Sequence, residues 1–154
     1  MHNLLEIIEK LDTAFRYDAV ISLDYDSRKR GRLKTMTDTD EEAGLFLDRG
    51  QTLIDGDYLR ATDGRVVLVK AAAEPLTEVS TTDPVLLAKI CYHLGNRHTP
   101  VEIQPCAVRF QPDHVLSDLC RQWGLQVVDL EGSFNPERGA YSQYVVGGHG
   151  HHYD

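Results

Sequence analysis

The sequence predicts an α+β protein that has a small N-terminal β-sandwich or barrel domain, a second mixed domain and a flexible tail. Residues 1–72 contain short extended runs separated by Asp-Gly turns, which is typical of small sandwiches and barrels. Residues 73–132 contain two helical patterns among four extended segments, in the order β-α-β-β-α-β. Residues 133–154 are rich in Gly, Ser and Tyr and have almost no apolar periodicity, which predicts a flexible tail that contains three histidines.

The first domain begins with a segment whose type the sequence leaves open. Residues 1–17 are ambiguous between helix and strand, because their apolar side chains fit either one face of a helix or the start of a sheet: Leu4, Leu5, Ile7, Ile8 and Leu11. Residues 18–25 alternate apolar and polar side chains, and residues 28–37 continue as a second extended run, so both are predicted to be strands. The second of these strands is expected to present a solvated basic face that protects a sheet edge, formed by Arg28, Lys29, Arg30, Arg32 and Lys34. Further short strands follow, punctuated by turns at Asp55-Gly56 and Asp63-Gly64.

The second domain contains a predicted helix over residues 83–95. Asp83 can accept a hydrogen bond from an early helical N–H, and proline suits the first helical position. An apolar stripe at three- and four-residue spacing must be buried, and it comprises Leu86, Leu87, Ile90, Cys91 and Leu94. Gly95 is predicted to end the helix in a left-handed conformation, which leaves His98 in an exposed polar turn.

A second helix is predicted over residues 112–123, with Asp113 as its cap and Gly124 at its end. Its apolar face comprises Val115, Leu116, Leu119, Cys120 and Trp123. The strands around the two helices are predicted over residues 74–82, 101–104, 107–111 and 124–132. In this arrangement both helices cover one face of a four-stranded antiparallel sheet.

Composition excludes several classes of function. A formal net charge of −8 argues against a nucleic-acid partner, because such binding depends on clustered Lys and Arg. The N-terminus lacks a basic leader and no apolar run approaches about twenty residues, so we expect a cytoplasmic protein that does not enter a membrane.

The three cysteines are expected to be reduced and mostly in the core, although Cys91 could be drawn into metal chemistry. No catalytic motif is visible, so we do not expect an enzyme.

The histidines are the candidate metal ligands. The tail carries His149, His151 and His152 beside glycines, a pattern that suits zinc, copper or nickel, or else an inert polar end or the remnant of a tag. His98 cannot fill a coordination sphere alone, but in a symmetric dimer each copy supplies one imidazole. His93, five residues earlier on the helix, and His114, near the start of the second helix, are possible secondary sites or solvated side chains.

The segment CYHLGNRHTPVEI, preceded by DPVLLAK, resembles the urease accessory protein UreE family of nickel metallochaperones, and so does AGLFLDRGQTLIDGDYL in the first domain. The resemblance covers nearly the whole chain. It implies an N-terminal β domain that binds a protein partner and a ferredoxin-like C-terminal domain that forms a homodimer. It also implies that His98 meets its counterpart at the dimer interface and binds Ni²⁺ there, joined by His149, His151 and His152.

The resemblance therefore implies a metallochaperone that delivers Ni²⁺ to the urease apoprotein. Its expected partners are the urease apoprotein and an accessory GTPase complex. Zn²⁺ or Cu²⁺ is also expected to bind in vitro, because affinity for such ligands follows the Irving–Williams order. Only three histidines occur in the tail, which argues against large-capacity storage, and Gln111 and Pro112 leave His114 without histidine neighbours. The alternative function is a metal-independent protein-interaction module with an inert tail.

Overall fold

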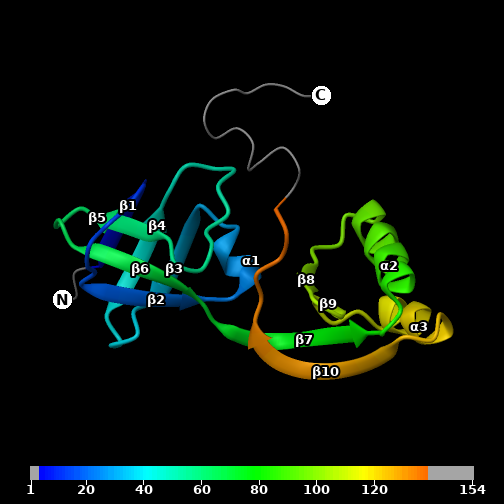
Figure 1. Cartoon of the computed structure of the whole chain (residues 1–154). Helices are drawn as coiled ribbons and strands as arrows, with labels where there is room; N and C mark the ends of the chain where they lie inside the picture. The colour runs from blue at the N-terminus through cyan, green and yellow to red at the C-terminus, as the bar shows by residue number, and fades with distance from the viewer. Residues whose placement is uncertain (1–3, 139–154) are drawn as a thin grey trace, which may run out of the picture. The chain divides into compact units, whose positions relative to one another are not determined.

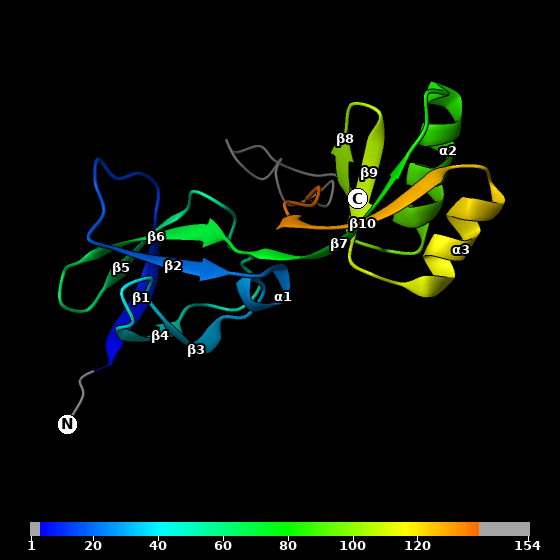
Figure 2. The same cartoon turned by 90° about the horizontal axis from the view of Figure 1, so that it is seen from below.

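The computed structural model describes residues 4–138 and divides into two compact units (Figure 1). The first unit runs to Glu74 and includes the later segment Glu131–Asn135. Its elements are β1 (Leu5–Leu11), β2 (Ala19–Leu23), α1 (Tyr25–Arg28), β3 (Arg32–Met36), β4 (Glu42–Phe46), β5 (Tyr58–Ala61) and β6 (Val66–Ala71). The six strands form one barrel-like sheet in the order β2-β6-β5-β1-β4-β3 (Figure 2). The mixed α+β class and the N-terminal β domain are thus as the sequence predicts.

The segment Leu5–Leu11, whose secondary structure the sequence leaves open, is the strand β1. Leu5 and Ile7 point inward and are buried, while Glu6 and Ile8 between and after them are exposed, which is the alternation of a strand. β1 pairs in parallel with β4 and antiparallel with β5, so it is a central strand of the sheet. Burial of each large aliphatic side chain here contributes about 1.5–3 kcal/mol relative to exposure.

Both predicted Asp-Gly turns of the first unit are confirmed. Gly56 and Gly64 have φ angles of 95° and 93°, in the left-handed region that glycine adopts without strain. Asp55 accepts a hydrogen bond from the N–H of Ala71 at 2.8 Å, and Asp63 accepts one from the N–H of Arg65 at 2.9 Å. The Asp55 bond links its turn to β6, and the Asp63 bond links its turn to Arg65, the residue before β6.

The predicted basic strand is partly wrong. Arg28 lies in the short helix α1 and is only 1% exposed, because the Asp24 side chain accepts a hydrogen bond from the N–H of Ser27 and starts a helical turn there. Arg32 and Lys34 do lie exposed on β3, which is the last strand in the sheet order. The basic edge predicted from the sequence therefore begins only at Arg32.

The second unit begins at Pro75, runs to Leu130 and resumes at Pro136. Its elements follow in the order β7 (Ala73–Ser80), α2 (Pro84–Asn96), β8 (Glu102–Gln104), β9 (Ala107–Phe110), α3 (His114–Gln122) and β10 (Gln126–Ser133). The sheet order is β10-β7-β9-β8, with β9 antiparallel to both β7 and β8. Figures 1 and 2 show α2 and α3 side by side on the same side of this sheet. Their buried side chains, including Ile90, Leu94, Leu116 and Cys120, pack with Val79, Val108 and Phe110.

Three side chains differ from the sequence-based expectation. Val115 is 54% exposed, because it lies in the first turn of α3 on the side away from the core. Cys106 is exposed, since it occupies the tight turn between β8 and β9. Phe134 falls in the segment predicted to be tail, yet it is fully buried against the first unit, where its ring meets that of Tyr25 edge-on at 5.4 Å.

None of the helices within residues 4–138 has the length and apolar character needed to cross a membrane.

Candidate functional site

The helix α2 begins as the sequence predicts. The Asp83 carboxylate accepts hydrogen bonds from the N–H groups of Val85 at 3.0 Å and Leu86 at 3.3 Å, and Pro84 occupies the first turn. Ile90 and Leu94 are fully buried in the core of the second unit. This buried stripe fixes the rotation of the helix about its axis.

The end of α2 differs from the prediction. The helix continues through Asn96, and the left-handed residue is His98, with a φ angle of 61°, and not Gly95. The N–H of His98 donates to the carbonyl of Gly95 at 2.9 Å, and the N–H of Thr99 donates to that of Leu94 at 3.1 Å. These two bonds form a Schellman motif, in which His98 takes the position that glycine usually occupies.

Pro100 explains why the helix ends where it does. A residue that precedes proline is disfavoured in the helical region, so Thr99 cannot continue the helix. The chain must therefore leave the helical conformation at or before that residue, and it does so at His98. For a residue with a side chain, the left-handed conformation costs about 1–2 kcal/mol, so the backbone of His98 is strained.

The surroundings of His98 favour a cation. Its side chain is exposed, just past the C-terminus of a helix of 13 residues. The helix dipole places partial negative charge at this end, which stabilises a nearby cation by about 0.3–1 kcal/mol at an exposed position. Neutral imidazole is a good ligand for nickel, copper and zinc. The turn can therefore supply one nitrogen ligand and a favourable local potential.

His93 and His114 have other surroundings. The ring of His93 meets the ring of Tyr92 edge-on at 5.4 Å and that of Trp123 at 5.0 Å, so it connects α2 to α3. His114 is exposed at the first position of α3, where Asp113 caps the helix as predicted. Within residues 4–138, no three or more His, Cys, Asp or Glu side chains are grouped so that they could hold a metal ion.

Two cysteines of the second unit, the half-buried Cys91 and the buried Cys120, are poor candidates for ligands. A thiol binds metal as the thiolate, and burial disfavours that charged form. Burial raises the pKa of the Cys91 thiol above its usual range, and it raises the pKa of Cys120 to about 11. The expectation that Cys91 takes part in metal chemistry therefore has no electrostatic support.

His149, His151 and His152 lie outside the described residues, but the chain that leads to them starts close to the His98 turn. The N–H of Glu137 donates to the carbonyl of Val101 at 2.7 Å. Val101 follows His98 by three residues and precedes β8. No sequence pattern indicated this bond, because it joins two irregular segments that are far apart in the chain.

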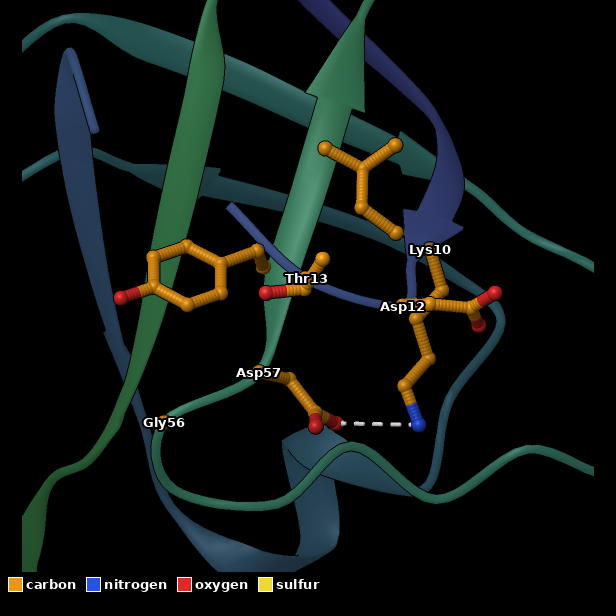
Figure 3. Close-up of a pocket in the computed structure, with 7 residues that line it drawn as sticks. Lys10, Asp12, Thr13, Gly56 and Asp57 are labelled. Atoms are coloured by element: carbon orange, nitrogen blue, oxygen red, sulfur yellow. Dashed lines mark ion pairs between the residues drawn. The ribbon is translucent and has the colours of Figure 1, made fainter. Parts of the chain in front are cut away.

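A separate cavity of about 250 Å³ lies in the first unit, at the end of β1 and beside the turn before β5 (Figure 3). Lys10 pairs there with Asp57 at 3.5 Å, and Asp57 also accepts a hydrogen bond from the N–H of Ile54 at 2.9 Å. The lining of the cavity includes Asp12, Thr13 and Gly56 but no histidine or cysteine. The Asp57 carboxylate is thus already used within the fold, and the cavity holds none of the predicted ligands.

Two family models together cover almost the whole chain. The model described as the N-terminal domain of the UreE urease accessory protein matches residues 2–72, and the one described as its C-terminal domain matches residues 74–154.

Individual relatives support the same assignment. A protein from Psychromonas ingrahamii named urease accessory protein UreE is 41% identical over 149 residues, which cover 96% of each chain. Proteins with the same name are 42% identical over 151 residues in Citrobacter koseri, covering 97% of each chain, and 48% identical over 136 residues in Dechloromonas aromatica, covering 85% of this chain and 75% of the relative. The chain belongs to the UreE family of urease accessory proteins.

Proposed function

We propose that the protein is a nickel-binding metallochaperone that delivers Ni²⁺ to apo-urease during urease maturation in the cytoplasm. The observation that carries the proposal is His98, an exposed imidazole held in a strained left-handed turn at the negative end of α2. The names of the relatives, all urease accessory proteins, support the urease connection. In this account the domain of residues 1–72 docks a protein partner and the domain of residues 73–132 holds the metal.

A second copy of the chain would complete the site. One imidazole cannot hold Ni²⁺ firmly, and the face of α2 opposite its buried stripe is exposed and contains small or apolar residues. These residues are Val85, which is 62% exposed, Ala88 and Tyr92, which is 69% exposed. A homodimer formed through this face of the ferredoxin-like C-terminal domain would bury these side chains and bring two copies of His98 to one symmetry axis.

The tail would supply further ligands. His149 lies twelve positions after Glu137, whose N–H is hydrogen-bonded to Val101 near the His98 turn. An extended chain of that length spans about 40 Å, so His149, His151 and His152 can all reach His98. Ligands on a tethered segment can leave one at a time. That property suits delivery of Ni²⁺ to the accessory GTPase complex and the urease apoprotein.

Calorimetric titration with Ni²⁺ tests the proposal. We expect His98→Ala to weaken binding at least tenfold and to abolish a stoichiometry of one tight Ni²⁺ per two chains. His93→Ala and His114→Ala are matched controls, because both histidines are exposed, but the ring of His93 packs against Trp123 and His114 lies at the first position of α3. Unchanged affinity and stoichiometry in His98→Ala would remove His98 from the mechanism.

The alternative, a metal-independent interaction module, has its own test. A variant that combines His98→Ala with deletion of residues 148–154 lacks the proposed ligands but keeps the described fold. If it still activates urease in limiting nickel as well as the unaltered protein does, the alternative is correct.

A further inference from the structure

The first unit exposes large side chains on three neighbouring strands, β1, β4 and β3 (Figure 2). The residues beside them in these strands, such as Ile7 and Leu45, are fully buried, so the alternation of a strand places the exposed side chains on the outside of the sheet. The apolar ones are 36% to 46% exposed. We call this surface the outer face and define it by five exposed side chains: Ile8, Arg32, Lys34, Met36 and Phe46.

Strand pairing brings these side chains together. Arg32 of β3 lies opposite Phe46 of β4. Ile7 of β1 pairs with Leu45, so the next residue along each strand places Ile8 beside Phe46. The guanidinium carbon of Arg32 lies 5.8 Å from the centre of the Phe46 ring. A cation, an aromatic ring and an aliphatic side chain therefore form one row across the three strands.

Gly44 shapes the next row of the outer face. It lies opposite Lys34, so Lys34 has no side chain facing it on β4. A Cβ added to Gly44 would meet Cδ2 of Leu4 at 2.8 Å and Cε2 of Phe46 at 3.1 Å. Leu4 and Phe46 thus lie close over the backbone of Gly44. The result is an apolar surface that is bordered on β3 by two cations.

Arg32 differs from the other two arginines of the described strands. Arg60 on β5 donates to Glu9 on β1 at 2.9 Å, and Arg109 on β9 donates to Glu78 on β7 at 3.0 Å. Arg32 forms no ion pair with any of residues 4–138, and an aromatic ring lies opposite it where the others meet a carboxylate. The guanidinium is therefore available to a carboxylate from another molecule.

The carboxylates of this surface lie away from Arg32. Glu42 lies opposite Met36, and Glu6 lies on β1, on the other side of Gly44 from β3. A ligand that carried only acids would be repelled by these two glutamates. A single carboxylate over β3 would be attracted, provided that the rest of the ligand is apolar.

We propose that the outer face docks a protein segment that carries a carboxylate beside a large apolar side chain. The carboxylate pairs with Arg32 and Lys34, while the apolar side chain packs on Phe46 and Ile8. Aromatic and arginine side chains are the residues that most often dominate the energy of such contacts. The inference rests on the docking role that the proposed function gives to residues 1–72, and it is independent of nickel binding.

Selection from a phage-displayed library of random short peptides, with the full-length protein as bait, tests the chemistry of the ligand. We expect the enriched peptides to share an Asp or Glu next to, or two positions from, a Phe, Tyr, Trp or Leu, because alternate residues of an extended chain lie on one face. A peptide of aspartates alone should bind at least tenfold more weakly than the enriched one. Equal binding of the two peptides, or selection that enriches no such pattern, overturns the proposal.

Fluorescence anisotropy with the most enriched peptide locates the site. We expect Phe46→Ala and Arg32→Glu each to weaken binding at least fivefold. Phe15→Ala and Lys70→Glu are matched controls, because Phe15 is exposed in the loop after β1 and Lys70 is exposed on β6. Unchanged affinity in Arg32→Glu overturns the proposal. That variant alters an exposed side chain, so the test stands even if Phe46→Ala fails to fold.

Nickel titration separates this inference from the proposed function. Arg32→Glu should bind Ni²⁺ as tightly as the unaltered protein. If the unaltered protein binds no Ni²⁺ while peptide binding still requires Arg32 and Phe46, the nickel role fails and the docking surface is retained. If Ni²⁺ binding requires His98 while the peptide binds all variants equally, the docking surface fails and the nickel role is retained.

Discussion

His98 and Gly124 occupy the same position in the same helix-ending motif. At the end of α3, the N–H of Gly124 donates to the carbonyl of Arg121 and that of Leu125 to Cys120, both at 3.0 Å. His98 makes the equivalent bonds at the end of α2, with a φ angle of 61° against 87° at Gly124. Glycine adopts this conformation without strain, whereas histidine does not. Of these two helix ends, the strained one is therefore the one that carries the proposed ligand, which fits the tendency of strain to occur at functional sites.

Replacing His98 should separate stability from metal binding. We expect His98→Gly to raise the free energy of unfolding by about 1 kcal/mol, because it removes the left-handed strain, while it abolishes tight Ni²⁺ binding. Urea denaturation of the metal-free protein measures the first effect. Gly124→Ala is the matched control and should lower stability by about 1 kcal/mol through the backbone alone, since an added Cβ there meets no atom within 4 Å. A His98→Gly protein no more stable than the original would contradict this explanation.

The Asp83 cap at the start of α2 should contribute to the stability of the fold and not to metal binding. Asp83→Ala removes the acceptor for two helical N–H groups and should lower the free energy of unfolding by about 1 kcal/mol. Asp83→Asn keeps a side-chain oxygen in place and should cost much less. Thermal denaturation distinguishes the two variants. If Asp83→Asn were as unstable as Asp83→Ala, loss of the cap would not explain the lower stability of Asp83→Ala.

The exposed face of α2 should carry the dimer contact. Tyr92→Asp places a charge in a face that the second copy would cover, so we expect sedimentation to show mainly monomer and calorimetry to show weaker Ni²⁺ binding. Phe15→Asp makes the same kind of change at a fully exposed position in the first unit and should leave both properties unaltered. A Tyr92→Asp protein that remains dimeric would place the dimer contact elsewhere.

The three thiols should differ in reactivity. At pH 8 we expect iodoacetamide to modify the exposed Cys106 first, the half-buried Cys91 more slowly and Cys120 last. The pKa of Cys120 is raised to about 11, so only about one thiol in a thousand is ionised at pH 8, and the thiolate is the reactive form. Raising the pH should speed modification of Cys91 and Cys120 in the folded protein. Peptide mass spectrometry over time would show whether this order holds.

Local patterns predicted much of the fold. The caps Asp83 and Asp113, the turns at Gly56 and Gly64, and the glycine at the end of α3 each follow from neighbouring residues in the sequence, and the structure has all of them. Residues close together in the chain determine these caps and turns, so a single sequence contains enough information to predict them.

The features that the sequence did not predict depend on distant contacts. Arg28 looked like an exposed basic residue, and its burial requires carbonyls from Leu23, Leu53 and Phe134. Phe134 lies in a segment of loop-like composition, and its burial depends on the same contact. Gly95 was a reasonable helix end, but the left-handed conformation falls at His98, three residues later, just before the Thr99-Pro100 step at which a helix is disfavoured. The spacing to that proline was the signal that could have located it.

We propose that two copies of His98 hold one Ni²⁺ ion. The decisive measurement is a crystal structure of the full-length protein grown with Ni²⁺, with anomalous scattering at the nickel edge to identify the metal. We expect one Ni²⁺ on a two-fold axis between two α2 helices, bound by a ring nitrogen of His98 from each copy. Nickel bound within a single chain, or at a site without His98, would contradict it.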